Sequence, residues 1–221
     1  MSFDPAKTLP LHIATYLEDK IIRLDIKPGE RIYEVKIAKE TGVSQSPIRE
    51  AFRILESLHL VEITPRKGTI VTEITENFII SVYDIFNELV GLATIKTALN
   101  RTDEDLVEIE EALDKVSDSV ANGDLFEFNK SFFKWGMRCL DATYDPLLIN
   151  ILTGVTSSAR RLQYYSLLYR DISTTHKLAG ACELTTKYIA AKKDKDAAKN
   201  NRMHLAMEKD IILEVFRKHP M

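Results

Sequence analysis

The placement of proline constrains this fold more than any other feature of the sequence. Five of the seven prolines lie at or before Pro65, and Pro146 alone interrupts the stretch from residue 70 to residue 219. Because proline removes a backbone donor and clashes with the preceding helical turn, long helices require stretches that lack it. The sequence therefore predicts two domains, a small mixed domain over residues 1–75 and an all-helical domain over residues 76–221.

Periodic apolar residues predict three helices in the first domain. Two of them span residues 11–24 and 34–41, and the third follows Ser44, whose hydroxyl is expected to cap it. The third helix carries apolar side chains at positions i, i+3, i+4 and i+7, namely Ile48, Ala51, Phe52 and Leu55. This spacing places the apolar side chains on one face of the helix and leaves the opposite face polar.

Two β-rich runs, residues 60–64 and 69–74, follow the third helix and are joined by the turn Pro65-Arg66-Lys67-Gly68. Three helices and a hairpin with a basic tip form the layout of a winged helix-turn-helix. In that layout the third helix enters the major groove of DNA. We therefore expect a mainly α fold, with a winged helix-turn-helix followed by an antiparallel helical bundle.

Polar groups on the third helix and the hairpin are candidates for DNA contact. Arg49 can bond a phosphate or a guanine edge, and Gln45 can read adenine with its amide. Serine hydroxyls and the N–H groups at the start of the helix suit phosphate oxygens, while the hairpin cations suit the backbone or the minor groove. The predicted contact set is Arg31, Ser44, Gln45, Ser46, Arg49, Arg53, Arg66, Lys67, Gly68 and Thr69.

Simpler interpretations of three of these cations stay open. Arg49 and Arg53 are also what a solvated helix face would carry, and Glu50 and Glu56 lie close enough in sequence to pair with Arg53. Arg31 is equally consistent with a residue that supports the neighbouring loop.

The charge balance does not decide between DNA and other partners. Residues 1–75 hold 11 Lys+Arg and 11 Asp+Glu, so residues 76–221 hold 30 − 11 = 19 and 33 − 11 = 22, which gives the net charge of −3. A neutral domain can still present one basic face, because whole-chain sums hide distribution. A helical interaction module whose winged helix contacts protein therefore stays an alternative function.

Six helices are predicted in the second domain. The first begins at residue 76, and the second begins after Thr102 and Asp103, which are expected to cap it. The others cover residues 125–140, a segment starting at Pro146, residues 174–191 and residues 194–217. A bundle of this size can hold a small-molecule pocket between its helices.

The sequence also excludes several classes of protein. The N-terminal MSFDPAKTLP lacks the features of a secretory signal, and no stretch approaches about 18 uninterrupted apolar residues. Cys139 and Cys182 cannot supply a disulfide framework. We expect a cytoplasmic protein with reduced thiols and no membrane partner.

Catalytic motifs are missing from the sequence. It contains no P-loop, no GxSxG, no HExxH and no CxxC, and His176 has no identifiable nucleophile beside it. We therefore expect a protein that is not an enzyme.

The first domain resembles the DNA-binding domain of the GntR family of bacterial transcription regulators over about residues 10–74. The segments that carry the resemblance are Gly29–Ile32, Gly42–Phe52, Leu55–Val61 and Arg66–Val71. The resemblance implies a ligand-responsive regulator, more commonly a repressor, that binds a near-palindromic double-stranded DNA operator as a homodimer. The family usually carries Arg where this chain has Gln45, a departure that weakens one contact and alters the operator that is read.

The second domain looks like the FCD effector domain of the FadR subfamily over about residues 78–215. The likeness rests on the helix layout, on Tyr83-Asp84-Ile85 with Leu89, and on Asp196-Ala197-Ala198 followed by Met203-His204-Leu205. Many members of that subfamily bind a divalent metal through one Asp and three His, and the metal and a nearby Arg receive a carboxylate effector.

Most of that metal site is replaced in this chain. Asn129 and Phe133 stand at the Asp and His positions of the subfamily, Cys182 stands at a third, and only His204 matches. Such a set is poor for a hard cation, so no metal cofactor is expected. Phe86 occupies the place of the usual Arg, which leaves the effector unidentified.

The candidate pocket residues are Phe86, Asn129, Phe133, Arg160, Cys182 and His204. Ordinary roles stay open for several of them: an inert buried thiol for Cys182, a hydrogen-bonded bundle residue for His204, and a solvated face for Arg160-Arg161. The alternative for the two arginines is that, with Tyr164-Tyr165, they grip an anionic effector.

Overall fold

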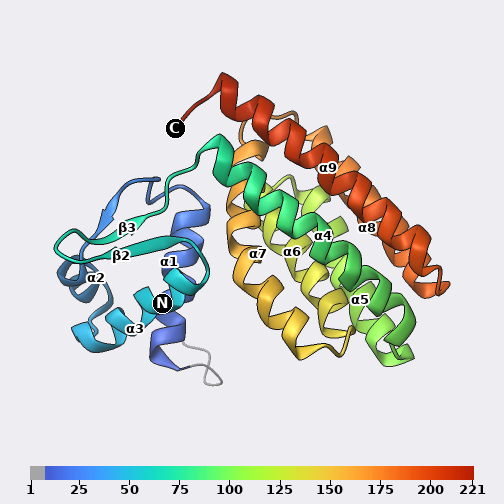
Figure 1. Ribbon diagram of the computed structural model, residues 1–221, viewed down its shortest axis with the longest axis horizontal. Helices are drawn as coiled ribbons and strands as arrows, with labels where there is room; N and C mark the ends of the chain where they lie inside the picture. Colours follow the sequence, from blue (N-terminus) through green and yellow to red (C-terminus); the bar gives the residue numbers. More distant parts are fainter. Residues whose placement is uncertain (1–7) are drawn as a thin grey trace. The chain divides into compact units, whose positions relative to one another are not determined.

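The computed structural model describes residues 8–221, which divide into two compact units between Thr75 and Glu76 (Figure 1). Unit 1 covers residues 8–75 and unit 2 covers residues 76–220. Most of the N-terminal segment considered above for a secretory signal, residues 1–7, lies outside the described residues.

Unit 1 contains three helices and a small sheet. Its elements are α1 (Leu9–Ile22), β1 (Arg31–Ile32), α2 (Glu34–Thr41), α3 (Gln45–Ser57), β2 (Val61–Thr64) and β3 (Gly68–Val71). The strands form an antiparallel sheet in the order β1-β3-β2. The sequence predicts the hairpin of β2 and β3 but not β1, because two residues are too few to show an alternating pattern.

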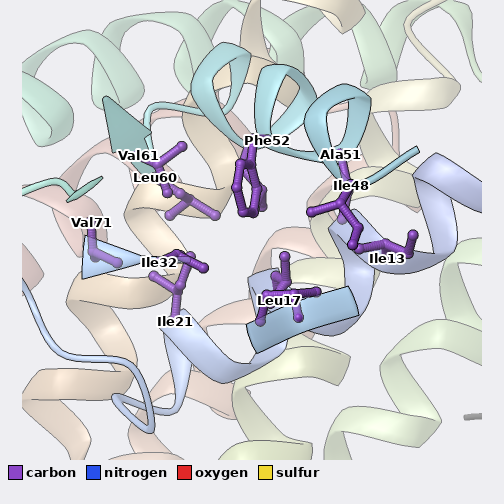
Figure 2. Packing of buried hydrophobic residues seen from close by; sticks show 13 residues of the cluster. Ile13, Leu17, Ile21, Ile32, Ile48, Ala51, Phe52, Leu60, Val61 and Val71 are labelled. Carbon is purple, nitrogen blue, oxygen red and sulfur yellow. The ribbon is translucent and has the colours of Figure 1, made fainter. Parts of the chain in front are cut away.

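The core of unit 1 forms where α3 packs on α1 and the sheet. Side chains from α1, α3 and the strands point toward one another around Phe52 (Figure 2). The apolar residues predicted on one face of α3 are all buried, namely Ile48, Ala51, Phe52 and Leu55. Burying such a side chain stabilises the fold by roughly 1.5–3 kcal/mol, so this face fixes which side of α3 meets solvent.

Unit 2 is a bundle of six helices among the residues described. They are α4 (Glu76–Asn100), α5 (Asp103–Asn122), α6 (Leu125–Asp141), α7 (Pro146–Leu167), α8 (Ser173–Ala190) and α9 (Asp194–Lys218). Helix α4 makes its most extensive contacts with α9 and also packs on α7 and α6 (Figure 1). The predicted fold class, a mainly helical winged helix-turn-helix followed by a helical bundle, is confirmed.

Helix caps set several boundaries in unit 2. The Thr102 hydroxyl accepts a hydrogen bond from the N–H of Asp105, and the Asp105 carboxylate accepts one from the N–H of Thr102. The cap at Thr102 is therefore as predicted, but its reciprocal partner is Asp105 rather than Asp103. At the start of α7 the Asp145 carboxylate accepts a hydrogen bond from the N–H of Leu148, directly before the helix-opening Pro146.

Helix α4 is the most apolar helix of unit 2. By length and composition alone it could cross a membrane, with a mean hydropathy of 1.5 over an 18-residue window. Asp84, Glu88 and Lys96 interrupt this helix, so it is not a stretch of about 18 uninterrupted apolar residues. Core helices of globular proteins reach the same hydropathy, and α4 packs on four other helices of this bundle, α6, α7, α8 and α9.

Candidate functional site

The exposed face of α3 carries the largest group of predicted DNA contacts. Five predicted contacts on α3 and the residue before it are exposed: Ser44, Gln45, Ser46, Arg49 and Arg53. The same helix also exposes Glu50, Glu56 and Ser57. Ser44 occupies the N-cap position, but its side chain makes no capping hydrogen bond. The expected cap is therefore wrong, and the N–H groups of the first turn keep no side-chain partner from Ser44.

Arg49 is held in place by two side-chain hydrogen bonds. Its Nε donates to Glu34 Oε2 at 2.8 Å, and its Nη2 donates to Gln45 Oε1 at 3.2 Å. The Arg49 side chain nevertheless stays 61% exposed. Glu34, the first residue of α2, is a member of this site that the sequence analysis missed. An exposed ion pair contributes roughly 0–1 kcal/mol to stability, so its main effect is to orient the guanidinium.

The hairpin presents Pro65, Arg66 and Lys67 as an exposed tip. Arg66 adopts a left-handed backbone conformation, with φ of 69°. Non-glycine residues in this region store strain of order 1–3 kcal/mol, and such strain is concentrated at functional positions.

Arg31 lies at the base of the hairpin. Its guanidinium is 4.9 Å from the centre of the Tyr33 ring, and a Cβ placed on Gly68 would lie 3.1 Å from its Nη2. Gly68 has φ of 80° and opens β3, so glycine suits this position both by conformation and by space. Arg31 therefore supports the hairpin while its side chain stays exposed.

Thr69 differs from the other predicted contacts because its side chain is 5% exposed. It pairs with Ile63 on one neighbouring strand and with Ile32 on the other. We leave Thr69 out of the proposed contact set, since its side chain faces inward.

A cavity of about 70 Å³ lies between the helices of unit 2. Three of the six candidate pocket residues, Phe86, Phe133 and His204, line it. The other lining residues come from α4, α6, α7 and α9 and include Thr94, Thr97, Trp135, Gly136, Met137, Cys139, Leu140, Leu152, Thr156 and Asn201. Trp135 and Cys139 line the cavity as well, although neither belongs to the six candidate pocket residues.

The structure places the other three candidates away from the cavity. Asn129 is fully buried, and its amide donates to the Arg160 carbonyl and to Gln163 Oε1, both at 3.0 Å. Cys182 is buried, and burial raises the pKa of its thiol well above the usual value. A thiol whose pKa is raised is a poor nucleophile and a poor metal ligand, which supports the inert interpretation of Cys182.

His204 is the most informative residue of the cavity. Its Nε2 is buried with no hydrogen-bond partner in the structure. Burial, together with the positive charge of Arg170, lowers the pKa of His204 to about 4. The imidazole is therefore neutral near pH 7.

The residues present do not fit the metal centre implied by the FadR-type resemblance. Across residues 8–221 no group of three or more His, Cys, Asp or Glu side chains is arranged to hold a metal ion. Asn129 and Cys182 do not line the cavity with His204, and Phe133, which does, has no donor atom.

Comparison with known proteins supports the interpretation of unit 1. Residues 9–71 match the family described as bacterial regulatory proteins, gntR family. The chain is 30% identical over 203 residues to the gluconate operon transcriptional repressor of Bacillus subtilis (strain 168), covering 88% of this chain and 82% of that protein. The chain belongs to the GntR family. The family and the homologues are transcription regulators, and this membership supports DNA-binding regulation as the function class.

A second relative and a solved structure extend the likeness over both units of this GntR protein. An uncharacterized HTH-type transcriptional regulator of B. subtilis (strain 168), YdhC, is 32% identical over 155 residues, covering 67% of this chain and 68% of that one. The E. coli McbR/YncC structure superposes with a TM-score of 0.83 at 19% identity, covering 94% of this chain and 98% of that chain. At this identity the superposition establishes the fold alone.

Proposed function

We propose that this GntR protein is a sequence-specific transcriptional repressor that binds a double-stranded DNA operator, and that a small molecule bound in unit 2 changes its operator affinity. The observation that carries the proposal is the exposed polar face of α3 opposite a fully buried apolar face. A helix held in this way can enter a major groove without disturbing the core. Gene repression is supported by the likeness to the gluconate operon repressor.

The contacts on DNA follow from the geometry of the α3 face. Arg49, oriented by Glu34 and Gln45, reads a guanine edge or clamps a phosphate, and Gln45 lies next to it to read adenine. Ser44 and Ser46 bind phosphate at the start of α3, where N–H groups that the Ser44 side chain does not cap favour anions. Arg53 binds phosphate farther along α3, and Arg66 and Lys67 extend to the backbone or minor groove.

Unit 2 supplies the homodimer in this proposal. Helix α4 exposes Ile85, Leu92 and Leu99, which are 50%, 41% and 56% exposed and spaced by seven residues. On α9, Met203 and Met207 are also exposed. A heptad spacing of apolar side chains is typical of a helix that packs against a second helix. Pairing of two copies through this surface would present two α3 helices to the half-sites of a near-palindromic operator.

The dimer surface has its own test. Leu92→Glu should convert a dimer to a monomer in sedimentation velocity, because it places a charge in the centre of the apolar stripe. Val107→Glu, at an exposed apolar residue of α5, is the matched control that should leave the dimer intact. Unchanged sedimentation of both variants would contradict this surface.

We further infer that unit 2 is an FCD-type effector domain of the FadR subfamily, with a degenerate metal site. The six-helix layout and the cavity beneath His204 support this assignment. A regulator that binds chromosomal DNA acts in the cytoplasm.

Fluorescence anisotropy tests the DNA-binding proposal. A labelled duplex from the region upstream of the protein's own gene and a scrambled duplex are titrated with the full-length protein over a series of salt concentrations. We expect preference for the native duplex and an affinity that falls steeply with salt, because phosphate contacts release counterions. Arg49→Ala should lose about 1–3 kcal/mol of binding free energy.

The control variant is Arg138→Ala, which removes another exposed arginine with acidic partners, Glu108 and Asp141, from unit 2. Its DNA affinity should equal that of the unmodified protein. Binding that does not respond to salt, or absence of binding to both duplexes and to a random DNA pool, would favour the alternative in which the winged helix contacts protein.

A further inference from the structure

The cavity of unit 2 has no charged side chain in its wall. Its lining residues include no Asp, Glu, Lys or Arg, and its largest surface is aromatic. The ring centres of Phe132 and Phe133 lie 5.4 Å apart. Phe86 extends this aromatic surface, with its ring centre 6.2 Å from that of Phe133. Trp135 extends it on the other side, 6.2 Å from Phe132. The lining side chains carry no charge to compensate a buried ionic ligand, whose desolvation would cost many kcal/mol. The nearby charge of Arg170, which acts on His204, is already paired with Glu208 at 2.8 Å.

The polar groups of the wall are mostly satisfied within the protein. Thr94 Oγ1 donates to the Val90 carbonyl and accepts from the Asn201 amide at 2.9 Å. Thr97 and Thr156 donate to carbonyls of their own or a neighbouring helix, and the Trp135 N–H donates to Thr186.

One lining group breaks this pattern. Among the lining residues described, His204 Nε2 is the buried side-chain nitrogen or oxygen that lacks a partner. A buried polar atom without a partner costs free energy, and a ligand that supplies the partner recovers it. The cavity wall is thus apolar apart from a single hydrogen-bonding position on α9.

We propose that this cavity binds a small uncharged molecule with an apolar body and one hydroxyl or N–H group, which hydrogen-bonds to His204 Nε2. The ligand is neither a carboxylate nor a metal chelate, because the wall supplies neither a cation nor a set of metal ligands. This inference rests on the proposed function, since it names the chemical class of the effector.

The volume of the cavity limits the ligand to a few heavy atoms. About 70 Å³ is roughly half of an engineered apolar cavity, about 150 Å³, that holds benzene. A four-carbon alcohol has five heavy atoms against the six of benzene, so it enters only if the wall moves slightly outward. Larger ligands require further movement of the wall, and Met137 is its most flexible side chain.

Isobutanol, isobutyrate and isobutylammonium form a probe set that shares one apolar skeleton and differs in charge. The chain has a single tryptophan, Trp135, and it lines the cavity, so its fluorescence reports on this site. We expect isobutanol to change Trp135 emission saturably and to raise the Tm of the full-length protein. The two ions should do neither at the same concentrations.

Two variants test whether the response comes from this cavity. Gly136 lines the cavity and has open space where a Cβ would project, so Gly136→Leu should fill it and weaken isobutanol binding by about tenfold or more. Gly180→Leu, at a helical glycine with equally open surroundings outside the cavity, is the matched control. His204→Phe keeps a ring but removes the hydrogen bond, and should weaken binding by about fivefold.

The outcomes separate this inference from the proposed function. Tighter binding of isobutyrate than of isobutanol, or an isobutanol response that survives Gly136→Leu unchanged, would overturn the ligand class even if operator binding is intact. An isobutanol response that weakens in both Gly136→Leu and His204→Phe would support the ligand class even if the anisotropy experiment showed no DNA binding. Anisotropy of the operator complex with and without isobutanol then tests whether ligand binding changes operator affinity.

Discussion

The exposed face of α3 and the cavity of unit 2 place polar groups in opposite surroundings. On α3, Arg49 is paired with Glu34 and Gln45 yet remains 61% exposed, so its charge stays available to a charged partner. In the cavity, His204 is largely buried among aromatic and aliphatic side chains and is held neutral. In the proposed function the first surface binds a polyanion and the second an uncharged molecule, so the two ligands do not compete for one site.

The two units also carry separate cores. A substitution in one core should therefore destabilise that unit and leave the other unchanged, and this is the largest effect that we expect. Phe52 is buried at the centre of the unit 1 core (Figure 2). Phe52→Ala should destabilise unit 1 by about 3–5 kcal/mol through the lost burial and the cavity left behind. The single tryptophan, Trp135, lies in unit 2, so urea unfolding followed by fluorescence should keep its midpoint while the circular dichroism signal unfolds in two steps.

A matched control for this variant is Leu162→Ala, which removes a fully buried side chain from unit 2. It should shift the fluorescence midpoint and leave DNA binding by unit 1 at low urea intact. One common transition shifted equally in both variants would contradict two separate cores.

The neutral state of His204 predicts a pH dependence that belongs to unit 2. Its pKa is about 4 in the folded protein and about 6.5 in an unfolded chain. The unfolded state therefore binds more protons between these values, and the free energy of unfolding falls as the pH is lowered through this window. A shift of this size corresponds to about 3 kcal/mol.

Comparison with His204→Phe isolates this contribution. The difference in unfolding free energy between the unmodified protein and the variant should decline by about 3 kcal/mol from pH 7 to pH 4. Chemical denaturation at a series of pH values, followed by Trp135 fluorescence, measures it. A difference that stays constant across the window would mean that His204 is not buried as a neutral group.

The sequence predicts the α3 face better than the cavity, for a physical reason. An amphipathic helix has one period, so the four buried residues of α3 identify its exposed polar residues without any tertiary information. The members that escape prediction depend on other elements. Glu34 reaches Arg49 from α2, and β1 is too short to show a pattern.

Thr69 shows how a shifted boundary misleads. With β3 starting at Gly68, Thr69 faces inward with Val71, as the two-residue period of a strand requires. A hairpin turn that includes Gly68 places Thr69 one residue nearer the tip and makes it a contact. The alternation of Thr69 with Val71 is the sequence signal that predicts an inward-facing Thr69 side chain.

The cavity depends on how four helices pack, which linear spacing does not encode. Counting back from His204 selects Cys182, whereas packing places Cys139 in the wall. Cys139 lies on α6, which contributes to the wall, whereas Cys182 lies on α8, which contributes no lining residue. Phe86, Phe133 and His204 are predicted from the FadR-type resemblance, which places them at effector-site positions of the subfamily, and all three line the cavity.

On the α3 face, Glu34→Gln sharpens the comparison by removing the acidic partner of Arg49 without removing bulk. Protein stability should change by less than about 1 kcal/mol, because the pair is exposed. Affinity for scrambled DNA should rise, since a negative charge near the phosphates is lost. Preference for the operator should fall by about fivefold, since the charge-assisted hydrogen bond that orients the guanidinium is weakened.

Anisotropy with the native and scrambled duplexes measures both quantities for Glu34→Gln. Glu40→Gln, which removes the acidic partner of Lys20 elsewhere on unit 1, should raise affinity for both duplexes alike and keep the preference. Equal preference in Glu34→Gln and the unmodified protein would assign Glu34 a purely structural role.

The smallest expected effect concerns two glycines inside helices of unit 2. Gly136 in α6 and Gly180 in α8 both have open space where a Cβ would project. Replacing a helical glycine with alanine adds about 0.5–1 kcal/mol of stability through backbone entropy and helix propensity. Thermal unfolding should therefore show a higher Tm for Gly136→Ala and for Gly180→Ala.

The two stabilised variants should differ in ligand binding. Gly136→Ala places a methyl group in the cavity and should weaken isobutanol binding, whereas Gly180→Ala should not. Stability gained together with binding lost would mean that the fold does not require glycine at 136 and that the open space serves a ligand. If Gly136→Ala instead destabilised unit 2, the space would belong to the packing, and the contrast between an open DNA surface and a closed ligand site would lose its main support.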